Sequence, residues 1–506
     1  MSYLDLMERV GQVNDMLNAQ SILDWDMRVM MPEAGDETRG KQLSTLSLTT
    51  HQLLVAADTR QMLAAAEAEV KPLPDSNAKK MMVRQVRDAV DYNVAIPPEL
   101  TRRRAQLSSK GHFIWAKARA ESDFSQYAPL LEEVVALNRE TAEAIGYKEH
   151  PYDALLFRYD SQDTVSSLKP LLDRLREAIL PLVKAVAEKE PPRVDFLERD
   201  YPIDKQHELS LMLAKTIGYD FKRGRLDTTL HPFEVSFTRN DVRITTRYNQ
   251  THLPTSVFGT IHEVGHALYE QGVDPAFTRT PFATDLVGLY AVGGVSYGAH
   301  ESQSRLWENF VGRSRQFWEV QFPAVQKIFP EQLADVSAEE FWRAVNRVRP
   351  GLVRTHADEL TYDLHIMLRT ELEAGLMDGS VKVRDLPKAW NAKIKEYLGL
   401  DVPNDGVGLL QDFHWSAGHI GNFANYTVGN MMAAQLFETA TRDVAISKGL
   451  KTGNYKPLHA FLTENVYQHG RRYDRDELLA RTTGRKLDPE PYIAYLNAKY
   501  TELYDL

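Results

Sequence analysis

The chain of 506 residues contains no cysteine. This absence excludes a disulfide scaffold, a thiol nucleophile and any thiolate metal site. A metal ion bound by this protein must therefore be held by histidine and carboxylate side chains. The chain has 15 histidines and 70 acidic residues from which such ligands could come.

A surplus of positive charge is also missing. Lysine and arginine number 60 against 70 acidic residues, which gives a formal net charge of −10. A nucleic-acid-binding protein usually needs a basic surplus, so we expect no nucleic-acid partner. No stretch approaches the roughly 18 apolar residues of a membrane span, and residues 1–15 carry acids where a signal peptide needs an apolar core. We therefore predict a cytoplasmic protein without a membrane partner.

Linkers, repeats and low-complexity segments are absent from the sequence as well. Length alone suggests about three domains of about 150 residues, but without a linker we predict a single domain over residues 1–506. Only residues 234–248 alternate as strands do, with two β-branched runs around Arg239-Asn240-Asp241 that indicate a hairpin. Amphipathic helical stretches cover roughly 36–70, 124–145, 163–190, 203–218, 337–346, 356–376 and 427–448. The predicted fold is mainly α, a large helical body with a small β-sheet.

The most informative stretch is the predicted helix over residues 255–272, which contains the motif His262-Glu263-Val264-Gly265-His266. Residues four apart lie on the same helix face, so His262 and His266 could bind one metal ion. Glu263 could then take a proton from a metal-activated water as that water attacks a carbonyl group. The alternative interpretation is a buried helix whose histidines only make hydrogen bonds.

Two histidines leave a catalytic zinc ion one protein ligand short. Residues 296–313 predict another helix, with Glu301 in its first turns. Glu301 could complete a His/His/Glu set, with the fourth position left to water. His300, Glu270 and Asp285 are rival ligands, and spacing alone leaves the choice open.

Further motifs occur in order along the chain. They are His231-Pro232-Phe233, Asp241-Val242-Arg243-Ile244-Thr245, His300-Glu301-Ser302-Gln303, the segment from Arg354 to Tyr362, and the segment from Gly408 to Trp415. Together with His262–His266 they resemble the carboxypeptidase Taq family, the thermostable carboxypeptidase 1 group of HExxH metallocarboxypeptidases. The resemblance covers essentially the whole chain.

The resemblance implies a single, mainly α-helical, zincin-like domain with a deep active-site groove, and usually a homodimer. The metal-site region would span about 231–426. It also implies an enzyme with one divalent ion per chain, Zn²⁺ or Co²⁺. This enzyme would release C-terminal amino acids from peptides with a free C-terminus, with broad side-chain tolerance and proline disfavoured.

Carried over position by position, the resemblance assigns His262, His266 and Glu301 as metal ligands and Glu263 as the general base. Glu263 would later return its proton to the leaving amine. Spacing alone does not select Glu301, so its assignment as a ligand rests on the resemblance.

Substrate binding is assigned to other residues. Arg354 is the first candidate for the terminal carboxylate, because arginine binds that group bidentately. Arg243 and His414 would support it, although Arg243 could equally form a cross-strand ion pair. Tyr426 would donate a hydrogen bond to the oxyanion or be a structural tyrosine, and His231 would line the groove or shape a turn.

Two departures from the family pattern concern the surroundings of the site. The segment around 285–294 is longer than the family usually has, which suggests a flap or rim near the metal. Asn422 stands where an aromatic residue is common, beside the oxyanion donor. The alternatives to a carboxypeptidase are an endopeptidase or dipeptidyl carboxypeptidase on a related helical zinc scaffold, and an inactive helical binding protein.

Overall fold

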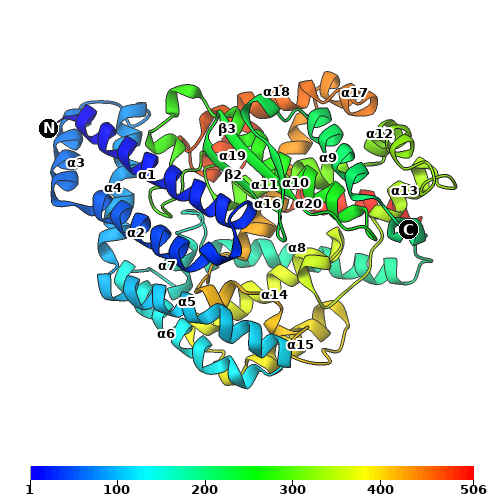
Figure 1. Cartoon of the computed structure of the whole chain (residues 1–506), viewed down its shortest axis with the longest axis horizontal. Helices are drawn as coiled ribbons and strands as arrows, with labels where there is room; N and C mark the ends of the chain where they lie inside the picture. Colours follow the sequence, from blue (N-terminus) through cyan, green and yellow to red (C-terminus); the bar gives the residue numbers. More distant parts are fainter. Residues whose placement is uncertain (1) are drawn as a thin grey trace. The chain divides into compact units, whose positions relative to one another are not determined.

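The computed structural model describes residues 2–506, and 69% of the chain is helical. In this range the chain forms 20 α-helices and one three-stranded sheet (Figure 1). The predicted mainly α fold with a small sheet is therefore confirmed. Among residues 2–506, no helix combines the length and apolarity that crossing a membrane requires.

The chain falls into two compact units, each built from three separate segments. Unit 1 comprises Met1–Val94, Pro192–Val345 and Met432–Leu487, and unit 2 comprises Ala95–Pro191, Asn346–Met431 and Asp488–Leu506. The metal-site region predicted from the sequence, about 231–426, contributes residues to both units. The single domain over residues 1–506 stays a prediction.

Unit 1 contains the sheet and most of the helices. Its elements are α1 (Tyr3–Val29), α2 (Asp36–Val55), α3 (Ala57–Val70), α4 (Ala78–Ala95, of which the last residue belongs to unit 2), α9 (Ile203–Ile217), β1 (Leu226–Thr228), β2 (Glu234–Thr238), β3 (Asp241–Thr246), α10 (Pro254–Gly272), α11 (Tyr297–Arg305), α12 (Arg315–Ile328), α13 (Ala338–Val345), α17 (Val444–Thr452), α18 (Lys456–Asn465) and α19 (Arg475–Thr483).

The regular secondary structure of unit 2 consists of helices. Its elements are α5 (Pro98–Glu121), α6 (Ala128–Ile145), α7 (Pro151–Leu156), α8 (Val165–Ala187), α14 (Glu359–Asp378), α15 (Leu386–Leu398) and α20 (Glu490–Tyr504), and it shares α16 (Ala424–Ala440) with unit 1. Nearly every residue of α14 is buried, and α14 packs against α6, α7, α8 and α15.

Two stretches predicted as continuous helix are each divided. The stretch 36–70 breaks at Ala56, whose ψ of 151° is not helical. The stretch 427–448 breaks before Asp443, whose side chain accepts a hydrogen bond from the Ala445 N–H and caps a new helix. The spacing of apolar residues is almost the same on both sides of each break. The amphipathic pattern in the sequence therefore does not reveal the breaks.

The predicted hairpin is present as β2 and β3, which pair antiparallel with Val235 opposite Arg243. A third strand, β1, pairs parallel with β3 and gives the order β1-β3-β2. We did not predict β1, because three residues are too few to show a strand's alternation.

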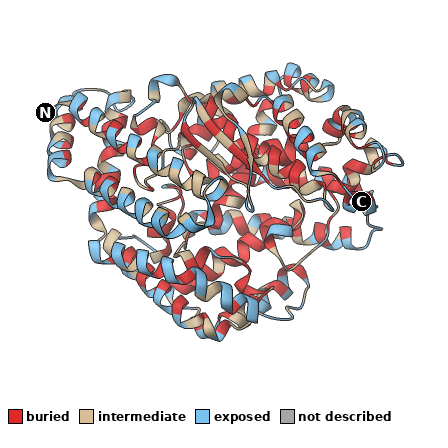
Figure 2. Cartoon of the chain, in the orientation of Figure 1, coloured by how far each residue is buried: buried red, intermediate tan, exposed pale blue. Residues whose placement is uncertain are grey.

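Helix α10 contacts more than four other elements of unit 1. It begins at Pro254, where a first-turn residue needs no amide donor, and it is buried on nearly every side (Figure 2). It packs against α9, α11, β2 and β3. Within the HExxH motif, Glu263, Val264 and Gly265 are buried, whereas His262 and His266 lie on the one face of the helix that stays partly exposed.

Gly265 allows α11 to approach α10 closely. A Cβ atom at this position would lie 2.6 Å from the Gln303 carbonyl oxygen and 2.6 Å from the Ser304 Cα. Ser296 caps α11 by accepting a hydrogen bond from the Ala299 N–H, which sets the start of the helix that carries Glu301. The motif's glycine and the cap thus place the two helices side by side at the site.

Candidate metal centre

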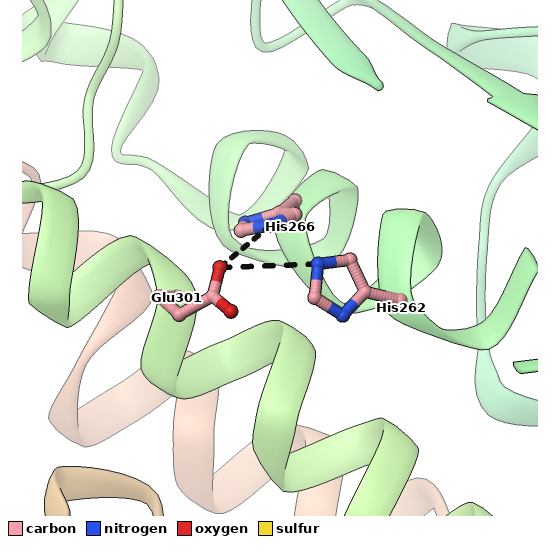
Figure 3. A group of neighbouring side chains, drawn as sticks. All are labelled: His262, His266 and Glu301. Atoms are coloured by element: carbon pink, nitrogen blue, oxygen red, sulfur yellow. Dashed lines mark ion pairs between the residues drawn. The ribbon is translucent and has the colours of Figure 1, made fainter. Parts of the chain in front are cut away.

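His262 and His266 project from α10 toward Glu301 on α11 (Figure 3). The Nε2 atoms of His262 and His266 lie 3.8 Å and 3.5 Å from the Oε2 atom of Glu301. One ligand atom from each of the three side chains lies within 4.8 Å of the others. Ligands about 2 Å from a common ion have such separations, so these three side chains fit a metal ion.

Both histidines use their other ring nitrogen within the protein. The Nδ1 atom of His262 lies 2.9 Å from the Oε2 atom of Glu308, and the Nδ1 atom of His266 lies 2.6 Å from the Nδ1 atom of His300. These contacts leave the two Nε2 atoms for a metal. Partners of this kind fix the ring orientation and tautomer of metal-binding histidines.

Glu308 was not predicted from the sequence. It lies on a π-helical turn, Leu306–Gly312, that continues α11. Arg305 donates to Glu301 at 2.8 Å and to Glu308 at 3.3 Å, and Arg313 donates to Glu308 at 3.2 Å. Glu301, Arg305 and Glu308 are spaced at i, i+4 and i+7, so the helical period could have signalled that they share a face.

Burial and the charges of neighbouring residues set the ionisation of the candidate ligands. Burial lowers the pKa of His266 to about 3, so its imidazole is neutral as a metal ligand requires. Burial would raise the pKa of Glu301, but Arg305 and the histidines hold it well below its usual value. Glu308 likewise has a pKa of about 2, because Arg305 and its contact with His262 outweigh burial.

Glu263 lies between the two histidines on α10, and its side chain is buried. Burial raises its pKa to about 7, against the opposing effect of His262. A carboxyl group with a pKa near neutrality is suited to both accepting and returning a proton.

Arg354, His414 and Tyr426 lie in unit 2, where Arg354 is the centre of a polar cluster. Its Nε and Nη2 atoms donate to the Oδ1 atom of Asp412 at 3.1 Å and 2.7 Å. The guanidinium carbon lies 5.4 Å from the centre of the Tyr426 ring. His414 is buried, and burial together with the charge of Arg354 lowers its pKa to about 3.

Asp412 is shared by two arginines. Its other carboxylate oxygen accepts from the Nε atom of Arg369, a fully buried side chain, at 2.7 Å. The buried carboxyl group of Glu373 also interacts with Arg369, but burial raises its pKa to about 7. Below that pH, two guanidinium groups and one carboxylate leave this cluster with one positive charge in excess. Such a charge favours an anionic ligand.

Arg243 and His231 belong to unit 1. Arg243 on β3 forms its ion pair with Asp241 of the same strand, at 2.9 Å, and not with a residue across the hairpin. Its guanidinium carbon lies 4.5 Å from the centre of the Trp25 ring. His231 is exposed in the loop between β1 and β2. Substrate-binding roles for both residues stay predictions.

The rival ligands have other partners in the described chain. Asp285 accepts hydrogen bonds from the backbone N–H groups of Val287 and Gly288, and lies 3.3 Å from Arg471. His300 and Glu270 contact each other at 3.0 Å. Among residues 2–506, the donors that converge as a potential metal site are His262, His266 and Glu301.

The sequence of this chain is similar to those of known proteins over nearly its whole length. The family model described as "Carboxypeptidase Taq (M32) metallopeptidase" matches residues 5–500. The chain belongs to the carboxypeptidase Taq (M32) family. Among M32 relatives, the chain is 37% identical to carboxypeptidase 1 of Bacillus subtilis, over 99% of this chain and 98% of that protein. It is also 37% identical to thermostable carboxypeptidase 1 of Thermus thermophilus, over 99% of both chains.

Solved M32 structures have the same fold. The crystal structure of the M32 carboxypeptidase from Deinococcus radiodurans matches with a TM-score of 0.95 and 38% identity, over 100% of this chain and 99% of that one. The resemblance inferred from the motifs is therefore confirmed. The protein is an M32 metallocarboxypeptidase, a peptide hydrolase whose family implies a divalent metal ion.

Proposed function

We propose that this M32 enzyme removes amino acids one at a time from the free C-terminus of peptides, with broad side-chain tolerance and proline disfavoured. His262, His266 and Glu301 would hold one Zn²⁺ or Co²⁺ ion per chain. The observation that carries the proposal is the convergence of these three donors beside Glu263, with both imidazole Nε2 atoms directed at Glu301.

A divalent ion held there supplies Lewis acidity, which polarises a peptide carbonyl and makes a water molecule more acidic. Glu263 acts as the general base, because it is a buried carboxyl group one position from a ligand and its pKa is about 7. It takes a proton from the attacking water and gives it to the leaving amine. Arg305 keeps Glu301 ionised through the hydrogen bond between them.

The free carboxylate of the peptide needs a cationic partner. We assign this role to Arg354, because its cluster with Arg369 and Asp412 retains one unbalanced positive charge. His414 would support Arg354 as a further substrate-binding residue, and Tyr426 would donate a hydrogen bond to the oxyanion. Arg243 and His231 remain weaker candidates for substrate contacts.

A peptide and its C-terminally amidated twin test the proposal. The metal-loaded enzyme is incubated with each, and the products are followed by time-resolved mass spectrometry. We expect a ladder that shortens by one residue at a time from the free C-terminus, with little cleavage of the amide. Equal cleavage of both peptides would instead favour an endopeptidase, and loss of two residues per step would favour a dipeptidyl carboxypeptidase.

We also propose a homodimer that acts in the cytoplasm, on the basis of the family resemblance and the cysteine-free composition. Sedimentation analysis at several protein concentrations tests the first part, and a single species with the mass of one chain, 57.6 kDa, would contradict it. Fractionation of the source cells tests the second part.

A further inference from the structure

The side chain of His300 lies between a candidate metal ligand and a buried carboxylate. Its Nδ1 atom is 2.6 Å from the Nδ1 atom of His266, and its Nε2 atom is 3.0 Å from the Oε1 atom of Glu270. Its ring stacks on that of Tyr269, with the planes 18° apart and the centres separated by 5.6 Å. Both ring nitrogens and one face of the His300 ring therefore have partners. His300 itself is not one of the three residues whose ligand atoms converge.

Only one proton arrangement satisfies this chain of contacts when His266 binds a metal through Nε2. The Nδ1 atom of His266 must then carry a hydrogen, which it donates to the Nδ1 lone pair of His300. His300 must in turn carry its hydrogen on Nε2, which it donates to Glu270. A nitrogen–nitrogen distance of 2.6 Å requires one shared proton, so both tautomers are determined together.

Glu270 is anchored in turn by backbone groups. Its carboxylate accepts hydrogen bonds from the N–H groups of Gly293 and Gly294, each at 2.9 Å in its shorter contact. Glu234 is another carboxyl group near the His300 Nε2 atom, but at 4.0 Å it is too far away to accept a hydrogen bond. Glu270 is therefore the acceptor for His300.

The two glycines explain how the segment around 285–294 reaches this site. A Cβ atom on Gly294 would lie 2.4 Å from the His300 Cδ2 atom, and one on Gly293 would lie 2.7 Å from the Val273 Cγ2 atom. Larger residues would push the backbone away from Glu270. Leu286, earlier in the segment, is buried in the apolar cluster formed with α1, α3 and α4. The segment is thus packed in place at both ends.

We propose that His300 is a positioning residue for the metal ligand His266, and that Glu270, held by Gly293 and Gly294, fixes His300. The segment around 285–294 then supports the metal site through the hydrogen bonds of Glu270 and His300. His262 differs, because Glu308 contacts it directly without an intervening imidazole. This inference rests on the metal site of the proposed function.

The zinc affinity of the full-length chain tests the proposal, and this measurement does not depend on enzyme activity. Zinc dissociation constants are measured by competition with a chromophoric chelator. The variants are His300→Leu, which removes the acceptor, His300→Asn, whose side-chain oxygen can replace Nδ1, and Glu270→Gln. The matched control is His459→Leu, since His459 is a partly buried histidine of unit 1 whose ring packs against Tyr467 and not against a candidate ligand.

We expect His300→Leu to weaken zinc binding by roughly 10- to 100-fold, the usual effect of losing a partner of a metal ligand. His300→Asn should recover part of that loss, Glu270→Gln should weaken binding by about tenfold, and His459→Leu should change it by less than about twofold. At saturating Co²⁺, His300→Asn should keep the visible absorption bands of the unaltered chain, because the ligand set is unchanged.

Zinc binding by a folded His300→Leu variant that equals that of the unaltered chain would overturn the proposal. If that variant fails to fold, unchanged zinc affinity in both His300→Asn and Glu270→Gln would overturn the proposal instead. Cobalt bands that change in His300→Asn as they do in a Glu301→Gln reference would make His300 a ligand, and would also overturn it. Failure of the unaltered chain to bind zinc would contradict the proposed function itself, which separates the two.

Discussion

Replacing Gly265 with alanine adds one methyl group where α10 and α11 are closest. The new Cβ atom would lie 2.6 Å from the Gln303 carbonyl oxygen, 2.6 Å from the Ser304 Cα and 2.9 Å from the Ser304 nitrogen. All three are backbone atoms of α11, so no side-chain rotation can relieve the contact. Non-bonded carbon atoms prefer a separation of about 3.5–4.0 Å. The two helices must therefore move apart by about 1 Å.

That movement displaces Glu301, which precedes Ser304 by one helical turn. Metal–ligand distances tolerate only about 0.2 Å of error, so we expect zinc affinity to fall at least tenfold, or about 1.4 kcal/mol. Overpacking costs about 1–3 kcal/mol, and the better helix propensity of alanine returns up to about 1 kcal/mol. With the full offset, the metal-free protein should lose up to about 2 kcal/mol of unfolding free energy.

Gly259→Ala is the matched control on the same helix. A Cβ atom there would meet Pro232 and Thr246 at 3.8 Å, an ordinary contact distance. Urea unfolding of the metal-free proteins and chelator competition for zinc provide the two measurements. We expect Gly259→Ala to be as stable as the unaltered chain, or slightly more so, with unchanged affinity. The reasoning fails if Gly265→Ala behaves like this control in both measurements.

Three other perturbations have defined outcomes. Glu263→Gln should retain zinc in a metal assay while kcat falls by roughly 10²- to 10⁴-fold, and full turnover of the zinc-loaded variant would exclude Glu263 as the base. Arg354→Lys cannot bind a carboxylate bidentately, so KM for free peptides should rise while the slow cleavage of amidated peptides is unchanged; an equal effect on both would refute carboxylate recognition. Glu373 is fully buried, and burial raises its pKa from 4.5 to about 7. Its stabilising contribution is complete below about pH 4.5 and is lost as the pH rises through 7, about 3 kcal/mol at 1.36 kcal/mol per pH unit. Glu373→Gln should therefore flatten the fall in unfolding free energy between pH 5 and pH 8, and parallel curves for variant and unaltered chain would contradict this assignment.

Local patterns were enough to predict α10 and the hairpin of β2 and β3. In both cases the signal is a repeat of side-chain types over neighbouring residues. The HExxH spacing likewise predicted that His262 and His266 share a face. The third ligand did not follow from spacing, because the distance between α10 and α11 depends on the contact at Gly265, which no periodicity records.

The partners of the ligands were also beyond local patterns. Glu308 depends on the π-helical turn after α11, and the contact between His266 and His300 joins residues 34 positions apart. The two compact units were not foreseen, since each combines three separate segments and no linker composition marks the boundaries. These features arise from tertiary packing.

Anomalous diffraction from crystals of the zinc-loaded protein, recorded on both sides of the zinc absorption edge, tests the central claim most directly. We predict a single strong peak per chain within bonding distance of the Nε2 atoms of His262 and His266 and of the carboxylate of Glu301. A peak bound by His300 or Glu270 instead, or one located away from α10 and α11, would contradict the account.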